Sequence, residues 1–125
     1  MRWRTVTSSS SDSTSSDPMW LVRDTVVLSS LEVADRRVDR ARGLLGRDGI
    51  DGALLIRSTR SVHTVGMRFA IDVAFLDDEL AVVRVCSLRP NRFSPLVWKA
   101  RHVLEAEAGS FREWNLAAGD QLEAR

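Results

Sequence analysis

The stretch that decides the fold is VHTVGMRFAIDVAFLD, at residues 62–77. It brings His63, Arg68 and Asp72 together within ten residues and then runs into a strongly apolar segment. Residues that can do chemistry therefore stand directly beside a segment that must be buried. We interpret the rest of the chain outward from this junction.

The apolar half of the stretch predicts a strand over residues 71–76. Side chains two positions apart on a strand share a face, so Ile71, Val73 and Phe75 would lie on one face and Asp72, Ala74 and Leu76 on the other. Asp77-Asp78 predicts a hairpin turn into a second strand at residues 80–86. Because both faces of these strands are largely apolar, we expect them to be central in the sheet. Ahead of them we expect a strand around residues 61–66 and a bend near Gly66.

The N-terminal end differs sharply from this core. Residues 5–17 hold seven Ser, three Thr and two Asp, with Val6 as the only apolar side chain. Such a segment buries too little surface to offset the entropy lost on ordering it. We therefore expect residues 1–18 to be a disordered Ser-rich tail and residues 19–125 to form a single domain. Met19 is a second candidate for the start of translation.

Between the tail and the stretch at 62–77, residues 20–34 predict two short strands with a turn at Arg23-Asp24. Asp35 is a suitable N-cap, and apolar residues recur at helical spacing after it. These signals predict a short amphipathic helix over residues 36–45 that ends at Gly46.

The remaining segments extend the β pattern. Residues 53–56 predict a buried strand, residues 103–107 a strand with Glu105 and Glu107 facing outward, residues 111–116 a short helix, and residues 121–123 a last strand. Strands and helices do not alternate along the chain. The sequence therefore predicts a mainly β fold, a compact antiparallel barrel or open sandwich of short strands with one short helix near 36–45, which could also be classed as α+β.

Composition excludes several classes of protein. The 125 residues are 44% hydrophobic and 28% charged, as in an ordinary soluble globular protein. No uncharged run approaches the ~18 residues needed to span a bilayer, and no apolar segment of a secretory signal follows the N-terminus. We expect a cytoplasmic location, and the single cysteine, Cys86, agrees with a reducing compartment.

The charge of the chain is unevenly distributed, although the net value is only +1. Residues 36–60 hold seven Arg against three Asp, and residues 84–101 hold four Arg and Lys99 with no acid. If these two segments meet in space, they form an anion-attracting patch. Seventeen of the eighteen basic residues are Arg, which favours bidentate contacts with carboxylate or phosphate, or reflects a plain compositional bias.

The candidate catalytic residues are His63 and Asp72, as a general-base pair in which Asp72 orients the imidazole. In the alternative interpretation His63 is a half-buried strand residue and Asp72 caps a backbone turn, since no nucleophile motif accompanies the pair. Cys86 lies among apolar strand residues, which is typical of an inert buried cysteine. Glycine-rich phosphate motifs and closely spaced metal ligands are absent from the sequence, so we expect no cofactor and no metal.

A long basic loop is predicted at residues 89–101. Its aromatic residues, Phe93 and Trp98, could stack on a ligand while its cations contact anions; the cations are Arg89, Arg92, Lys99 and Arg101. The alternative is a solvated surface loop held in place by two buried aromatic side chains. Because the overall charge is close to neutral, a nucleic-acid partner is disfavoured.

Three segments are similar, in this order, to domain-of-unknown-function family 192, also known as uncharacterised protein family 0127. They are RGLLGR at 42–47, HTVGMRFAIDVAFLD at 63–77, and VLEAEAG at 103–109 followed by Gly119-Asp120. The resemblance covers about residues 20–124 and implies a compact β-rich domain without an established reaction. Many relatives carry Trp-Met in place of His63-Thr64, so a catalytic role for His63 cannot be general to the family. Many also have Pro where Ala70 stands.

These observations favour a small non-enzymatic binding or accessory domain. In this interpretation Arg42, Arg47 and Arg68 line a cleft for a small anionic ligand, beside His63 and Asp72. Two alternatives stay open. One is a hydrolase-like enzyme that uses the His–Asp pair for acid–base catalysis, and the other is a protein–protein interaction module whose basic loop docks on an acidic partner.

Overall fold

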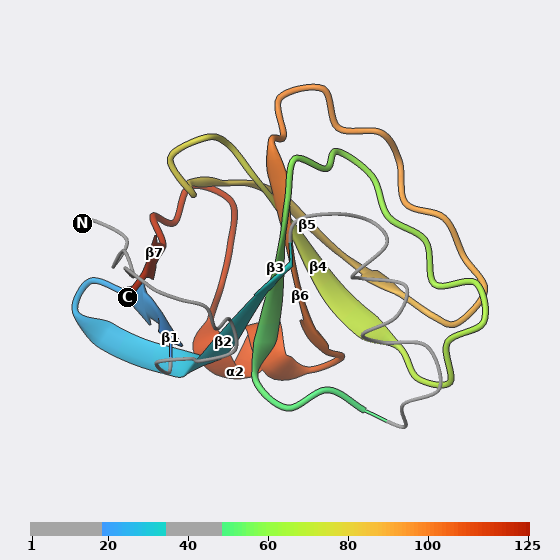
Figure 1. Ribbon diagram of the computed structural model, residues 1–125, viewed down its shortest axis with the longest axis horizontal. Helices are drawn as coiled ribbons and strands as arrows, with labels where there is room; N and C mark the ends of the chain where they lie inside the picture. The colour runs from blue at the N-terminus through green and yellow to red at the C-terminus, as the bar shows by residue number, and fades with distance from the viewer. Residues whose placement is uncertain (1–18, 35–48) are drawn as a thin grey trace, which may run out of the picture.

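The computed structural model describes residues 19–34 and 49–125, and its regular elements form one sheet with a short helix (Figure 1). The elements are β1 (Met19–Arg23), β2 (Val26–Ala34), β3 (Ala53–Arg57), β4 (Ile71–Leu76), β5 (Val82–Leu88), β6 (His102–Glu107), α2 (Ser110–Trp114) and β7 (Glu123–Ala124). The predicted tail at 1–18 and the predicted helix at 36–45 lie outside the described residues. The mainly β class is confirmed, and so are the short helix after residue 110 and the hairpin that joins β4 to β5.

The strands are hydrogen-bonded in the order β5-β4-β6-β3-β2-β1-β7. Every described pair is antiparallel except β2 and β3, which run parallel, so the sheet is mixed where the sequence predicted an antiparallel one. The sheet does not close into a barrel. A single bridge between Ala81 and Gln121 links the chain ahead of β5 to the chain ahead of β7.

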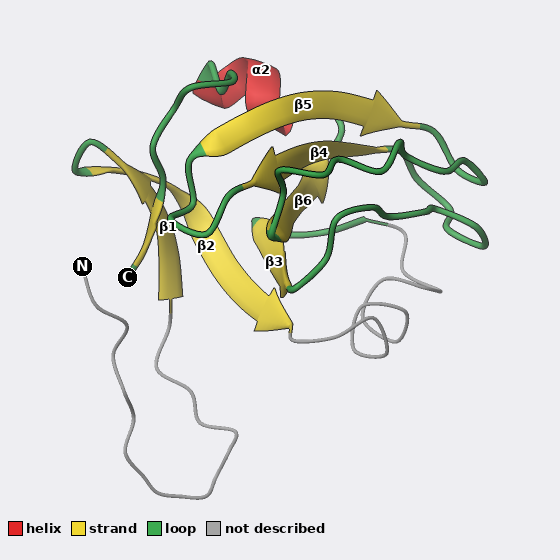
Figure 2. Cartoon of the chain, turned by 90° about the horizontal axis from the view of Figure 1, so that it is seen from above, coloured by secondary structure: helices red, strands yellow, loops and turns green. Residues whose placement is uncertain are grey.

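Both faces of the central strands are buried, and each face has its own apolar cluster. On one face Ala74, Leu104 and Leu76 pack with residues from β1, β7 and α2. On the opposite face Val73, Phe75 and Val103 pack mainly beneath two long loops. Figure 2 shows α2 on one side of the β4–β5 hairpin and the two loops projecting beyond the far ends of the strands. We call these two layers the helix-side cover and the loop-side cover.

Three details differ from the sequence predictions. The segment at 61–66 is a loop with one isolated bridge, at His63, because its backbone pairs with another loop and not with the sheet. The strand β5 lies at the edge of the sheet, whereas β4 is internal as expected.

The third difference concerns Glu105, which is fully buried, whereas Glu107 is exposed as predicted. Glu105 lies in register with Leu54 of β3 and Val73 of β4, both buried on the loop-side face. The charge of the side chain suggested exposure, but Glu105 lies on β6 between β3 and β4, where its neighbours bury it.

Candidate interaction surface

The two long loops pair with each other and form a continuous layer at one end of the molecule. We call residues 58–70 and 89–101 together the loop ribbon; Figure 1 shows them running side by side, far from the turn between β1 and β2. Backbone hydrogen bonds join the loops along their length: Thr59 N to Arg101 O (2.9 Å), Val97 N to Arg60 O (3.0 Å), Ser94 N to Val62 O (2.8 Å) and Thr64 N to Arg92 O (2.8 Å). The ribbon is therefore an ordered structure and not a pair of independent loops.

Thr64 holds the two halves of the ribbon together. Its side chain is fully buried, and its Oγ1 donates to the carbonyl oxygen of Arg89 at 2.6 Å and accepts from the amide of Arg92 at 2.9 Å. Its own carbonyl oxygen accepts from the amides of Asn91 (2.9 Å) and Met67 (3.1 Å). One residue thus provides hydrogen-bond partners for backbone groups on both loops, and these partly shielded groups would cost stability without a partner.

Apolar side chains fix the underside of the ribbon to the sheet. Val62 and Met67 from the first loop, and Val97 and Ala100 from the second, are buried in the cluster that contains Val73 and Phe75. Each loop therefore contributes two buried side chains, which fix the position of the loop backbone relative to the sheet.

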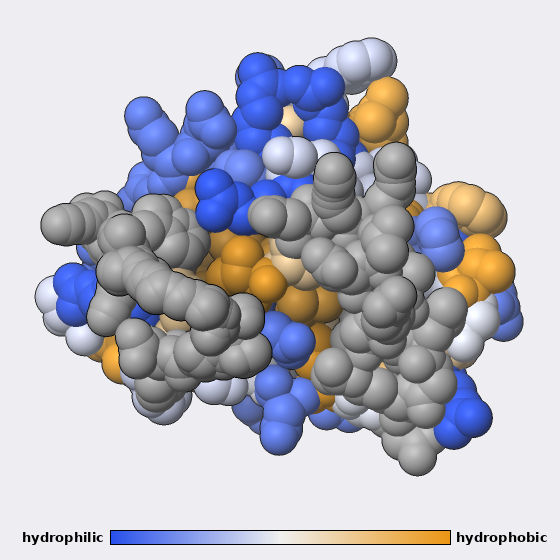
Figure 3. Space-filling model, in the orientation of Figure 1, coloured by the Kyte–Doolittle hydropathy of each residue, from blue (hydrophilic) through white to orange (hydrophobic). Residues whose placement is uncertain are grey.

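The outer side of the same ribbon exposes large apolar side chains. Phe93 is 72% and Trp98 73% exposed, and Val65 and Leu96 are exposed beside them in the same two loops. In Figure 3 apolar surface appears along the margin where Figure 1 places the ribbon. The expectation of two buried aromatic residues in this loop is wrong, because Val97 and Ala100 provide the buried anchors in their place.

The same loop also exposes cations. All four predicted basic residues of the second loop are exposed, namely Arg89, Arg92, Lys99 and Arg101. Exposed aromatic side chains and Arg on one ordered segment have the composition of a binding surface, because these residue types are enriched at protein interfaces.

The structure does not bring the proposed catalytic pair together. The two oxygens of Asp72 accept from the hydroxyl of Ser87 (2.7 Å) and from the amides of Gly109 (3.0 Å) and Phe111 (3.1 Å), so this buried carboxylate holds the start of α2. His63 lies on the loop ribbon, over the opposite face of the sheet, with its ring 5.7 Å from that of Phe93 and its Nδ1 accepting from the amide of Val65. The arrangement of Asp72 agrees with the interpretation in which it caps a backbone turn.

The predicted Arg-lined cleft is only partly within the described residues. Arg42 and Arg47 lie outside them, and Arg68 is exposed on the loop ribbon. The cleft therefore stays a prediction. Asp72 is the one proposed member that has a defined place elsewhere, because its hydrogen bonds direct it to the helix side.

Cys86 is half-buried on β5, and burial raises the pKa of its thiol, with the nearby Arg84 acting in the opposite direction. A raised pKa lowers the thiolate fraction at neutral pH, which agrees with an unreactive cysteine. In residues 19–34 and 49–125, no three His, Cys, Asp or Glu side chains converge in a way that could hold a metal ion.

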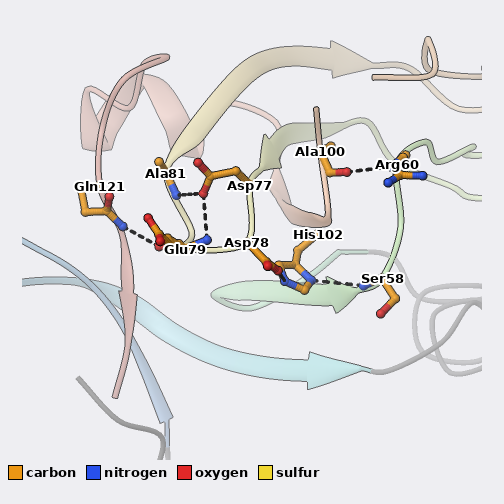
Figure 4. Close-up of polar contacts among 9 residues, drawn as sticks. All are labelled: Ser58, Arg60, Asp77, Asp78, Glu79, Ala81, Ala100, His102 and Gln121. Atoms are coloured by element: carbon orange, nitrogen blue, oxygen red, sulfur yellow. Dashed lines mark hydrogen bonds and ion pairs between the residues drawn. The ribbon is translucent and has the colours of Figure 1, made fainter. Parts of the chain in front are cut away.

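His102 lies at the base of the ribbon, where its two nitrogens face different groups (Figure 4). Nδ1 accepts from the amide of Ser58 at 3.1 Å, and Nε2 is 3.7 Å from the carboxylate of Asp78. Burial and the neighbouring Arg57 lower the pKa of His102, and Asp78 opposes them only weakly because it is 79% exposed and screened by water. The imidazole is therefore favoured in its neutral form, in which Nδ1 can accept the amide.

Comparison with known proteins assigns the family. Residues 21–124 match domain-of-unknown-function family 192, described as an uncharacterised ACR. The chain belongs to this family. It is 33% identical over 98 residues to a UPF0127 protein of Pyrococcus abyssi, covering 74% of this chain and 84% of that one. It is 37% identical over 67 residues to a UPF0127 protein of Pyrococcus furiosus, covering 54% and 58%. The resemblance noted from the sequence is confirmed.

Among solved structures, the fold is similar to that of a protein of unknown function from Novosphingobium aromaticivorans. The TM-score is 0.69, the identity 16%, and the match covers 85% of this chain and 83% of that one. At this identity the likeness concerns the fold alone. No helix of the described part of this family member is long and apolar enough to cross a membrane.

Sequence reasoning missed the role of Thr64 and the burial of Glu105. Thr64 gave no signal, because a threonine that bonds across 25 residues of chain has no local pattern. Glu105 did give one: Val103 and Glu105 share a strand face, and an apolar residue two positions away indicates a buried face.

Proposed function

We propose that this family member is a non-enzymatic binding domain, and that its loop ribbon docks on an acidic protein surface. The observation that supports this most is the exposure of Trp98 and Phe93, at 73% and 72%, on a backbone that Thr64 and buried apolar anchors hold in place. Aromatic residues and Arg are the side chains most enriched at protein interfaces, and a preorganised backbone lowers the entropy lost on binding.

The charge of the ribbon selects the class of partner. The two loops of the ribbon, residues 58–70 and 89–101, hold six Arg or Lys and no acid, so a docking surface must supply carboxylates to complement them. Arg89, Arg92 and Arg101 can each bind a carboxylate through two parallel hydrogen bonds. A protein partner fits better than a nucleic acid, because the net charge of +1 gives no general attraction to a polyanion.

The test is a comparative capture experiment with the full chain immobilised at low salt. Wild type, Trp98→Ser, Phe93→Ser and the matched control Trp20→Ser are exposed to a nuclease-treated extract of the source cells. Trp20 is a suitable control because it is also exposed, at 43%, but lies on β1, outside the ribbon. A captured protein is then purified and its affinity measured against all four chains.

The proposal expects an acidic protein that binds wild type and Trp20→Ser, and that loses roughly tenfold or more in affinity with Trp98→Ser, as for a central aromatic anchor. Binding should weaken as salt rises, because exposed charge contacts are screened over ~8–10 Å. Equal binding by all four chains would place the interface elsewhere. Binding that is seen only in a parallel extract without nuclease treatment would assign the surface to nucleic acid and contradict the proposal.

A further inference from the structure

The outer edge of β5 offers backbone hydrogen-bonding groups beside the loop ribbon. β5 pairs with β4 on one side and is the first strand of the sheet, so its other side has no neighbouring strand among the described residues. Among the backbone bonds of the described residues, those on that side involve its first residue, Val82, which bonds to Asp120 and Gly119. Residues 83–88 therefore form a six-residue edge at which alternate amides and carbonyls face outward.

The opposite end of the sheet differs from this one. There the last strand, β7, has only two residues, Glu123 and Ala124. Short edge strands are a common way to prevent unwanted pairing. The longer edge at β5 has one of the usual protections, the exposed cation Arg84, which repels basic chains and attracts acidic ones.

The edge of β5 runs directly into the ribbon. Leu88 ends the strand and Arg89 begins the second loop of the ribbon, so Arg84 and this loop belong to one acid-free segment, residues 84–101. An extended acidic segment that lies along β5 would therefore meet Arg84 on the strand and then Arg89 where the ribbon begins.

We infer that the partner adds an extended acidic segment as a strand to the free edge of β5, and that the ribbon receives the residues that follow it. Main-chain hydrogen bonds to residues 83–88 would supply sequence-independent affinity, whereas Arg84, Arg89 and the exposed aromatic residues would select carboxylates and apolar side chains. This inference rests on the proposed function, because it specifies how the acidic partner of the ribbon is bound.

The test uses the full chain labelled with ¹⁵N and two capped octapeptides of alternating Glu and Val. One peptide has an ordinary backbone, and the other has every peptide nitrogen methylated, so it keeps the side chains but cannot donate main-chain hydrogen bonds. Amide hydrogen exchange and amide chemical shifts are followed at low salt. Strand addition predicts slower exchange at alternate residues within 83–88 and at least tenfold weaker binding of the methylated peptide.

Charge variants sharpen the result. Arg84→Glu should weaken binding of the ordinary peptide roughly tenfold, because one attraction becomes a repulsion. Arg112→Glu, the same change on the exposed surface of α2, should leave binding unchanged.

The outcomes separate this inference from the proposed function. Equal binding of both peptides, with shifts confined to the ribbon, would overturn strand addition and leave ribbon docking intact. The ordinary peptide could instead slow exchange on β5 and bind the Trp98→Ser chain as tightly as wild type. That result would support strand addition at β5 and contradict ribbon docking. If neither peptide binds, both are contradicted.

Discussion

The helix-side cover and the loop-side cover of the sheet are held by the same kind of hydrogen bond, but they expose different side chains to solvent. Each is fixed by one buried polar side chain that bonds to backbone amides far along the chain: Asp72 bonds to Gly109 and Phe111, and Thr64 to Arg92. On the helix side Phe111 and Leu116 point into the core. On the loop side the buried anchors alternate with exposed aromatic residues, of which Trp98 is the most exposed.

This difference indicates that exposure on the loop ribbon is not a sign of poor order. A poorly packed loop would lack both the buried anchors and the satisfied amides, whereas the ribbon has both. The exposed aromatic residues are therefore displayed by a fixed backbone, which is the arrangement expected of an interface. Four experiments test the comparison, from the largest expected effect to the smallest.

Removing the polar residue of the helix side should have the largest effect. Asp72→Ala leaves two amides at the start of α2 and the Ser87 hydroxyl without their acceptor, and should lower the free energy of unfolding by roughly 3 kcal/mol. Urea denaturation measures the loss. Asp77→Ala is the matched control, because its carboxylate accepts two amides in an exposed turn, from Glu79 and Ala81 (Figure 4). Equal losses in the two variants would mean that the buried carboxylate of Asp72 contributes no more to stability than the carboxylate in the exposed turn.

The corresponding change on the loop side is Thr64→Val, which keeps the shape and removes the hydroxyl. We expect a loss of about 1–2 kcal/mol in the free energy of unfolding, because the partly buried backbone groups of Arg89 and Arg92 lose their partner. Amide exchange should accelerate in residues 89–92 and remain slow in α2. Thr59→Val is the control, since its hydroxyl makes one long bond of 3.3 Å. Uniform acceleration across the domain would mean that the covers are not independently fixed.

Backbone strain also differs between the turn that joins β1 to β2 and the loop ribbon. Thr25, in the turn between β1 and β2, has a φ of 69°, an uncommon conformation for a β-branched residue, whereas Asn91 of the ribbon has a φ of 62° and tolerates it. Thr25→Gly should therefore stabilise the protein by about 0.5–1 kcal/mol. Asn91→Gly should not, because it removes the oxygen that accepts from Gly66. Thermal unfolding of both variants decides the point, and a destabilised Thr25→Gly would contradict it.

The smallest effect concerns pH at the base of the ribbon. The fold lowers the pKa of His102, so folding favours the neutral imidazole. The free energy of unfolding linked to this group is therefore at its full value above the ordinary pKa of 6.5. The contribution declines as pH falls below that value and stops declining below the folded-state pKa. Urea midpoints at pH 7.5 and 5.5 should therefore differ less in His102→Gln than in wild type. An unchanged dependence in His102→Gln would contradict the assignment.

What the sequence by itself determined was local in origin. Alternation over residues 71–76 and the Asp77-Asp78 turn predicted the β4–β5 hairpin, and the short helix after Ser110 was predicted from its own residues. The position of the basic loop, with all its cations exposed, also followed from local composition.

Only the tertiary structure decided which partners the buried polar residues bond to and which loops pack against each other. Asp72 bonds to residues 37 and 39 positions away, and Thr64 to residues 25 and 28 positions away, so no local pattern could reveal their partners. Burial of Glu105 likewise depends on its neighbours in β3 and β4. Strand periodicity acts between residues two positions apart, whereas hydrogen bonds between loops depend on where the whole chain has folded.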